Sequence, residues 1–286
     1  AKNLYGPSGG LLSLFLFCIC PNILAHGSLY TTDMAVTAFF FLAVRQAGKF
    51  FETLSFRDAA LTGFLTGCVM MSKVSGIILV PVLGCLGFLF LLNPRQEYSG
   101  VTPGKKYSVL TGFAVIGLTA LAVIVFGFTD FASAFQKLKP FSHYAQVFRA
   151  SVAHTQRFHA FCLGGSFVTC DWKYFPALLL IKTPVFSLIL IGAGILTWPF
   201  LKKSKLQIAL VFLPPLAFLF VACFMNNIHI GLRHILPVYP FLYLIAGAGV
   251  PAISSLRSPQ LRKILFGILF VAGGFTVSRH IRQMPY

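Results

Sequence analysis

The chain has 286 residues, of which 57% are hydrophobic and 10% are charged, and its formal net charge at neutral pH is +17. Soluble domains carry about 25% charged residues, so this composition excludes a soluble globular protein and indicates a polytopic membrane protein. The basic residues are scattered over short connections between apolar segments. This is typical of cytoplasmic loops and offers no continuous basic face to a nucleic acid, so we expect no nucleic-acid partner.

Long apolar segments follow one another along the chain and predict an all-α fold with about nine membrane spans, at the usual length of about 20 residues. The expected spans cover residues 9–25, 34–51, 59–72, 75–92, 107–128, 174–200, 206–225, 235–253 and 261–278. The first is expected to break near Pro21, and Lys73 is expected to separate the third from the fourth. Gly63 and Gly67 in the third span predict close packing against another helix. We expect one transmembrane domain, 1–286, with a polar loop at 129–173.

Basic residues alternate with the predicted spans in a way that fixes an orientation. Every second connection carries three of them: Arg45, Lys49 and Arg57; Arg95, Lys105 and Lys106; Lys202, Lys203 and Lys205; Arg257, Arg262 and Lys263. The positive-inside rule places these connections in the cytoplasm. The opposite, outer face then holds Asp33, Lys73, the 129–173 loop and the 226–234 turn, and we expect a single site there.

The segment 21–33 contains Asp33, the first of only six acidic residues in the chain. An acid between two membrane spans is costly to place near lipid and usually has a functional role. We interpret Asp33 and His26 as catalytic candidates at the mouth of a membrane-embedded site for a charged substrate. The structural alternative is a helix join in which Thr31, Thr32 or Asp33 caps the following helix.

Cationic side chains on the same predicted face are candidates for binding a phosphate. Lys73 lies at the expected helix break, and Arg233 and His234 precede an apolar run. Lys182 is expected about two turns inside the span 174–200, where it needs an anion or must extend to the interface, and Pro184 frees a backbone carbonyl nearby. Together these residues suit a phosphate or diphosphate group. The alternative for each is an ion pair with a lipid phosphate.

Four motifs occur in the order in which a known family has them. They are Leu4-Tyr5-Gly6-Pro7 followed by Pro21-Asn22-x-Leu24-Ala25-His26-Gly27 and Thr31-Thr32-Asp33; Ser72-Lys73-Val74-Ser75-Gly76; Trp172-x-Tyr174-Phe175-Pro176 with Lys182-Thr183-Pro184; and Gly231-Leu232-Arg233-His234-x-Leu236-Pro237-Val238-Tyr239-Pro240. With them the chain resembles the polyprenyl-phosphate-dependent glycosyltransferases of the protein O-mannosyltransferase superfamily, whose bacterial members include the aminoarabinose lipid A transferase.

The resemblance implies a GT-C membrane fold and an inverting transfer of a hexose or pentose from a polyprenyl-phosphate carrier to a lipid, glycan or protein acceptor. The reaction would take place on the outer face of a membrane, which we expect to be a bacterial inner membrane. Lys73, Lys182, Arg233 and His234 would bind the donor phosphate. No cofactor is required, although a divalent cation on Asp33 is possible.

In this family the principal catalytic acid lies in a first outer loop that precedes the matched motifs. The chain therefore looks like a fragment without the N-terminal part, and we expect the fragment alone to be inactive. Asp33 matches the second outer acid of the family. It could orient the acceptor, assist the missing acid or hold a metal.

Two other classes of function remain open from the residues alone. One is a transporter or flippase of a lipid-linked or anionic substrate, and the other is a non-catalytic subunit that binds the lipid carrier. His154, His159 and Cys162 fit no common zinc spacing. Cys162 and Cys170 face the predicted oxidising side, and whether they form a disulfide is left open.

Overall fold

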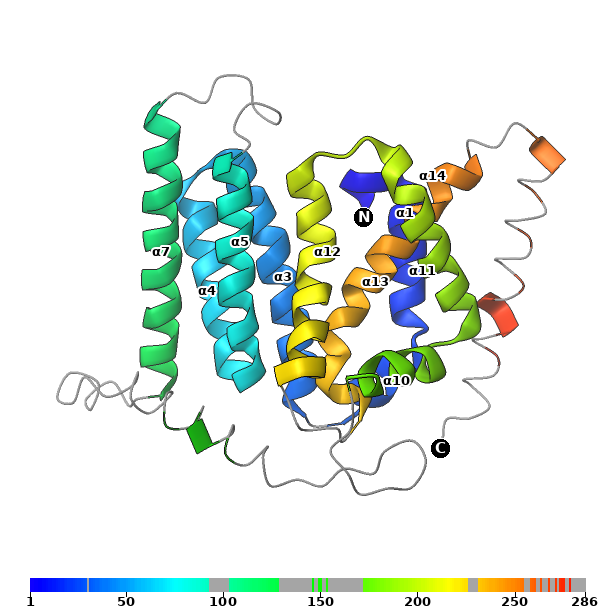
Figure 1. Cartoon of the computed structure of the whole chain (residues 1–286), viewed down its shortest axis with the longest axis horizontal. Helices are drawn as coiled ribbons and strands as arrows, with labels where there is room; N and C mark the ends of the chain where they lie inside the picture. The colour runs from blue at the N-terminus through cyan, green and yellow to red at the C-terminus, as the bar shows by residue number, and fades with distance from the viewer. Residues whose placement is uncertain are drawn as a thin grey trace. The chain divides into compact units, whose positions relative to one another are not determined.

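The computed structural model describes residues 1–29, 31–92, 103–128, 172–225 and 231–254, with isolated positions in 146–153 and 258–278. Within these ranges every regular element is a helix, which agrees with the predicted all-α fold (Figure 1). The chain forms two compact units. Unit 1 comprises Ala1–Tyr30, Pro176–Lys203 and Tyr239–Tyr286, and unit 2 comprises Thr31–Phe175 and Ser204–Val238.

Unit 2 is a set of helices packed along their lengths. Its elements are α3 (Thr32–Thr53), α4 (Phe56–Ser72), η1 (Val74–Ile78), α5 (Leu79–Leu92), α7 (Pro103–Phe128), α12 (Lys205–Phe220), η3 (Val221–Met225) and η4 (Leu232–Val238). Helix α4 packs against both α3 and α7. The predicted close approach at the small residues is confirmed, because a Cβ added at Gly67 would lie 2.5 Å from Cβ of Val123 on α7.

The predicted break between the third and fourth spans is confirmed at Lys73. This residue has an extended backbone, with φ −160° and ψ 143°, between the end of α4 and the start of η1. The start of α3 and the α4–η1 junction lie at the lower edge of unit 2 in Figure 1, whereas the α3–α4 turn and the start of α12 lie at its upper edge. Within unit 2 the predicted outer positions are thus separated from the predicted inner ones.

Unit 1 is built around α13 (Tyr239–Ala246), against which α1 (Lys2–Cys18) and α11 (Val185–Thr197) pack. Its other elements are α2 (Pro21–Gly27), most of α10 (Tyr174–Lys182), η2 (Trp198–Leu201) and α14 (Gly249–Ser254). Glycines permit this packing: a Cβ at Gly9 would lie 2.9 Å from the carbonyl oxygen of Gly247. The expected break near Pro21 is confirmed, since α1 and α2 meet at 56°.

The prediction of one continuous span over 174–200 is wrong. Helices α10 and α11 meet at 115°, with Thr183 and Pro184 at the break. Proline lacks the N–H that a helix needs and disfavours helical geometry in the residue before it, which accounts for the break at this position. The expected span 235–253 is also interrupted, because the described residues there form η4, α13 and α14.

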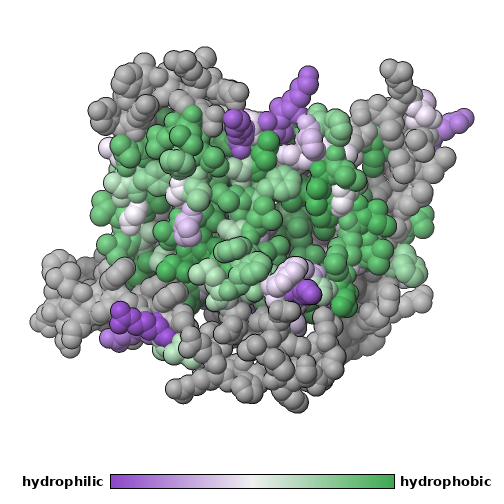
Figure 2. Space-filling model, in the orientation of Figure 1, coloured by the Kyte–Doolittle hydropathy of each residue, from purple (hydrophilic) through white to green (hydrophobic). Residues whose placement is uncertain are grey.

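The count of nine spans is not confirmed. Within the described ranges, three helices are long and apolar enough to cross a membrane, or up to five if each bent pair is one span. Figure 2 shows mainly apolar side chains on the described part of this face. Among the described residues of the whole chain, Phe88 at 62% exposure and Leu118 at 67% are large exposed apolar side chains, which suits contact with lipid. The expected span 261–278 and loop 129–173 lie almost wholly outside the described residues, together with Cys162, Cys170, His154 and His159.

Candidate functional site

Asp33 lies in the first turn of α3, where its side chain is only 6% exposed. A negative charge is favourable at this end of a helix because the free backbone N–H groups carry partial positive charge. Its carboxylate nonetheless needs a partner, since burying an unpaired charge is strongly unfavourable. The sequence segment places the acid here because Thr31 is extended and the helix begins directly after it.

The partner of Asp33 is Lys73, whose Nζ lies 2.5 Å from Oδ1 of the carboxylate. The two residues are 40 positions apart in the sequence, and they meet because α3 and α4 pack against each other. The Lys73 side chain is 24% exposed, so the pair is open to solvent or substrate on the lysine side. The structure therefore brings together the predicted acid and one of the predicted cations.

The capping alternative for this segment does not match the contacts. Thr31 is the N-cap residue of α3 and makes no side-chain cap hydrogen bond. The Asp33 carboxylate bonds to Lys73, and among the described residues its second oxygen, Oδ2, has no hydrogen-bond partner. The pair thus keeps an acceptor oxygen and further N–H groups with which to meet a ligand.

Arg233 and His234 belong to the same unit as Asp33. They lie on η4, which packs against α3 and α12. The Arg233 side chain is exposed, and His234 is half-buried. Gly231 precedes them with φ +138°, a conformation that strongly favours glycine.

Lys182 and His26 belong to unit 1. Lys182 is the last residue of α10, about two turns after Tyr174 as the sequence predicted, and it is exposed; the helix ends there because Pro184 follows. His26 is in the last turn of α2, and its Nδ1 is buried without a hydrogen-bond partner among the described residues. The six candidates are divided between two units, so their assembly into one site stays a prediction.

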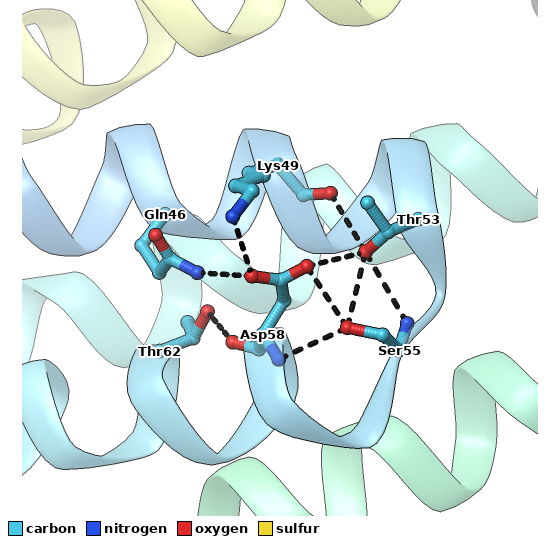
Figure 3. Close-up of polar contacts among 6 residues, drawn as sticks. All are labelled: Gln46, Lys49, Thr53, Ser55, Asp58 and Thr62. Carbon is cyan, nitrogen blue, oxygen red and sulfur yellow. Dashed lines mark hydrogen bonds and ion pairs between the residues drawn. The ribbon is translucent and has the colours of Figure 1, made fainter.

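The sequence interpretation missed a second buried carboxylate, Asp58, in the first turn of α4 (Figure 3). Four side chains contact it: Gln46 at 2.8 Å, Lys49 at 3.1 Å, Thr53 at 2.7 Å and Ser55 at 2.9 Å. The hydrogen bond from Thr53, together with those from the other three, holds the pKa of Asp58 well below its usual value. The Ser55-x-x-Asp58 spacing, a known start signal for helices, could have revealed it.

An apolar groove lies on unit 2 between α4, α5 and α7, with a volume of about 380 Å³. Gly84 of α5 and Gly117 of α7 line it, and a Cβ added at either would meet no atom within 4 Å. Met70 of α4 also lines it, one helical turn before Lys73. Within the described ranges, no three His, Cys, Asp or Glu residues are grouped as metal ligands.

Comparison with known proteins gives one match. Residues 1–126 match the model of the family described as dolichyl-phosphate-mannose-protein mannosyltransferase. No curated protein and no solved structure matches the chain significantly. The matched part contains His26, Asp33 and Lys73, whereas Lys182, Arg233 and His234 lie beyond it. Residues 1–126, which supply the Asp33–Lys73 pair, are thus similar to this family of glycosyltransferases, in agreement with the resemblance that the sequence motifs indicated.

Proposed function

We propose that this protein takes part in the transfer of a sugar from a polyprenyl-phosphate carrier to an acceptor on the outer face of the membrane. The observation that carries the proposal is the buried Asp33–Lys73 pair, which lies inside the region that matches the glycosyltransferase family. The acceptor is a lipid, a glycan or a protein. The expected membrane is a bacterial inner membrane.

The two side chains supply the two kinds of group that this transfer needs. Asp33 accepts the proton of the acceptor hydroxyl while the oxygen of that hydroxyl bonds to the anomeric carbon of the sugar. Alternatively, Asp33 orients the hydroxyl for another acid. The bond between the anomeric carbon and the phosphate oxygen breaks on the opposite face, which inverts the configuration. Lys73 stabilises the charge that grows on the departing lipid phosphate, so it favours the transition state more than the ground state.

The apolar groove supports a lipid-linked donor. Thr66 and Met70, one turn apart on α4, line the groove, and Lys73 follows Met70 by three residues, directly after α4 ends. Lys73 is therefore close in the chain to the part of the groove that Met70 lines. A carrier whose phosphate binds Lys73 can therefore place its isoprenoid chain in the groove, whose volume is in the range of about 300–1,000 Å³ of ligand sites.

The remaining candidates complete the proposed donor site. Lys182, Arg233 and His234 bind the lipid phosphate, and His26 assists proton transfer from the acceptor. Lys182 and Arg233 are exposed cations that make no ion pair with any described residue. A divalent cation on Asp33 is an optional part of the proposal.

A transfer assay tests the proposal. Membranes containing the natural full-length protein are given polyprenyl phosphates that carry radiolabelled sugars, and product is measured with and without an Asp33→Asn substitution. We expect label in an acceptor, and at least about a tenfold loss in the variant, as for loss of a positioned catalytic group. Movement of the labelled lipid across the bilayer without transfer would instead identify a flippase. Binding of the carrier without transfer or movement would identify a carrier-binding subunit.

Chemical labelling tests the orientation. In a background without native cysteines, Leu29→Cys should react with a membrane-impermeant thiol reagent added outside, whereas Ser204→Cys should not. The reverse pattern would contradict the assignment of the site to the outer face.

A further inference from the structure

A hydrogen-bonded network in unit 1 joins the two breaks of its bent helix pairs. The amide Nδ2 of Asn22, next to the α1–α2 break, donates to the carbonyl oxygen of Lys182 at 2.9 Å and to Oη of Tyr239 at 3.1 Å. The hydroxyl of Tyr239 also lies 2.9 Å from Oγ1 of Thr183. Tyr239 is completely buried and Thr183 is 3% exposed, so the bond between these two residues is shielded from water, whereas the bond from Asn22 to Lys182 is exposed.

The network compensates for a local defect of the chain. Because Pro184 ends α10, the carbonyl of Lys182 has no helical N–H to receive and requires another donor. Asn22 supplies that donor from a segment 160 positions earlier in the sequence. Tyr239, at the start of α13, holds the Asn22 amide on its other side. The backbone of Lys182 is thereby fixed by two residues that do not contact its ammonium group.

We propose that Asn22 and Tyr239 are positioning residues that hold Lys182 where its ammonium group meets the phosphate of the lipid carrier. This inference rests on the proposed function, in which Lys182 binds that phosphate. Neither residue touches the substrate: both act through the backbone of Lys182 at the α10–α11 break. The direction of α10 at its end, and hence the place where the lysine side chain emerges, depends on the two hydrogen bonds of the Asn22 amide.

Unit 1 offers a matched control for the tyrosine. Tyr5 is also buried, at 8% exposure, and its hydroxyl has no hydrogen-bond partner among the described residues. Tyr5→Phe and Tyr239→Phe remove the same atom from the same unit, but only the second breaks the network. A difference between the two variants therefore reports the network and not the loss of a hydroxyl.

The test measures binding of a long-chain polyprenyl phosphate to the purified full-length protein in nanodiscs, together with the melting temperature. Asn22→Ala and Tyr239→Phe should each raise Kd by about three- to tenfold, because each removes two hydrogen bonds of the network and the net contribution of a neutral hydrogen bond is modest. Tyr5→Phe should leave Kd unchanged. Lys182→Met should raise Kd at least as much as either network variant.

Double variants distinguish positioning from a general structural role. If Asn22 acts through Lys182, Asn22→Ala should have no further effect on Kd in the Lys182→Met background. An equal additional loss in that background, or a lower melting temperature with unchanged Kd, would overturn the inference. So would Lys182→Met binding as tightly as the native protein. None of these results bears on the Asp33→Asn transfer assay, so the proposed function can fail or stand separately.

Discussion

Unit 2 contains two buried aspartates in equivalent places, Asp33 in the first turn of α3 and Asp58 in the first turn of α4, and each has a lysine partner. Asp58 also accepts hydrogen bonds from the side chains of Gln46, Thr53 and Ser55. Asp33 has Lys73 alone among the described residues. The two carboxylates therefore share a position on their helices and differ in how many donors surround them.

This difference supports a structural role for Asp58 and the proposed catalytic role of Asp33. Four side-chain donors occupy the acceptor sites of Asp58, so it ties the end of α3 to the start of α4 and has little capacity for a ligand. Asp33 retains an unbonded oxygen beside a partly exposed ammonium group. A group that must accept a proton or orient a hydroxyl needs that free acceptor. The numbers of donors support a structural role for Asp58 at one end of the α3–α4 pair and the proposed catalytic role of Asp33 at the other.

Removing Lys73, the partner of Asp33, should have the largest effect. Lys73→Met leaves Asp33 buried without a counter-ion, a change of about 3–5 kcal/mol for a buried pair, and it also removes the proposed phosphate ligand. We expect transfer to fall by at least about tenfold, with a lower melting temperature. Lys73→Arg should restore the melting temperature more than transfer, because a guanidinium has a different shape. Native transfer rates with a lower melting temperature would make this pair structural, like that of Asp58.

Filling the groove should have an intermediate effect on long-chain donors. Gly84→Leu and Gly117→Leu meet no atom at Cβ, so they should fold and block the groove. We expect Kd for a long-chain polyprenyl phosphate to rise several-fold and Kd for dimethylallyl phosphate to stay unchanged. The short chain cannot reach Gly84, which follows Lys73 by eleven residues, about 16 Å along a helix.

Gly192→Leu on α11 of unit 1 is the control, since its Cβ also meets open space. Equal weakening of both phosphates by the groove variants would show damage to the headgroup site. Unchanged binding of the long chain would remove the groove from the donor site.

Removing the carboxylate of Asp58 should change stability alone. Asp58→Asn should lower the free energy of unfolding by about 1–3 kcal/mol and leave transfer within about twofold. The pKa of Asp58 is lower in the folded chain than its ordinary value of 3.8. Its stabilisation is therefore complete above that pH and is lost as the pH falls through the folded pKa. The melting temperatures of native and variant protein should converge below about pH 4. A difference in melting temperature between the two proteins that stays constant down to pH 3 would contradict the structural role of the Asp58 carboxylate.

The sequence was sufficient to single out Asp33 and Lys73 as candidate residues and to predict the helix break at Lys73. A charge next to an apolar run and the length limit of a membrane span are both local signals. The sequence could not predict the ion pair of Asp33 and Lys73, which depends on how α3 and α4 align along each other. The sequence also did not reveal that α10 ends at Lys182. Hydrophobicity runs continuously through 174–200, and only the geometry at Pro184 reveals a 115° bend. Asp58 was overlooked because a charged residue beside a turn looks like an ordinary loop residue.

The most direct test of the account is to compare Asp33→Asn with Asp58→Asn in the same transfer assay and the same melting experiment. We expect Asp33→Asn to lower transfer by at least about tenfold with a small change in melting temperature, and Asp58→Asn to do the reverse. Transfer that survives Asp33→Asn, or that falls equally in both variants, would contradict the assignment of chemistry to the Asp33–Lys73 pair.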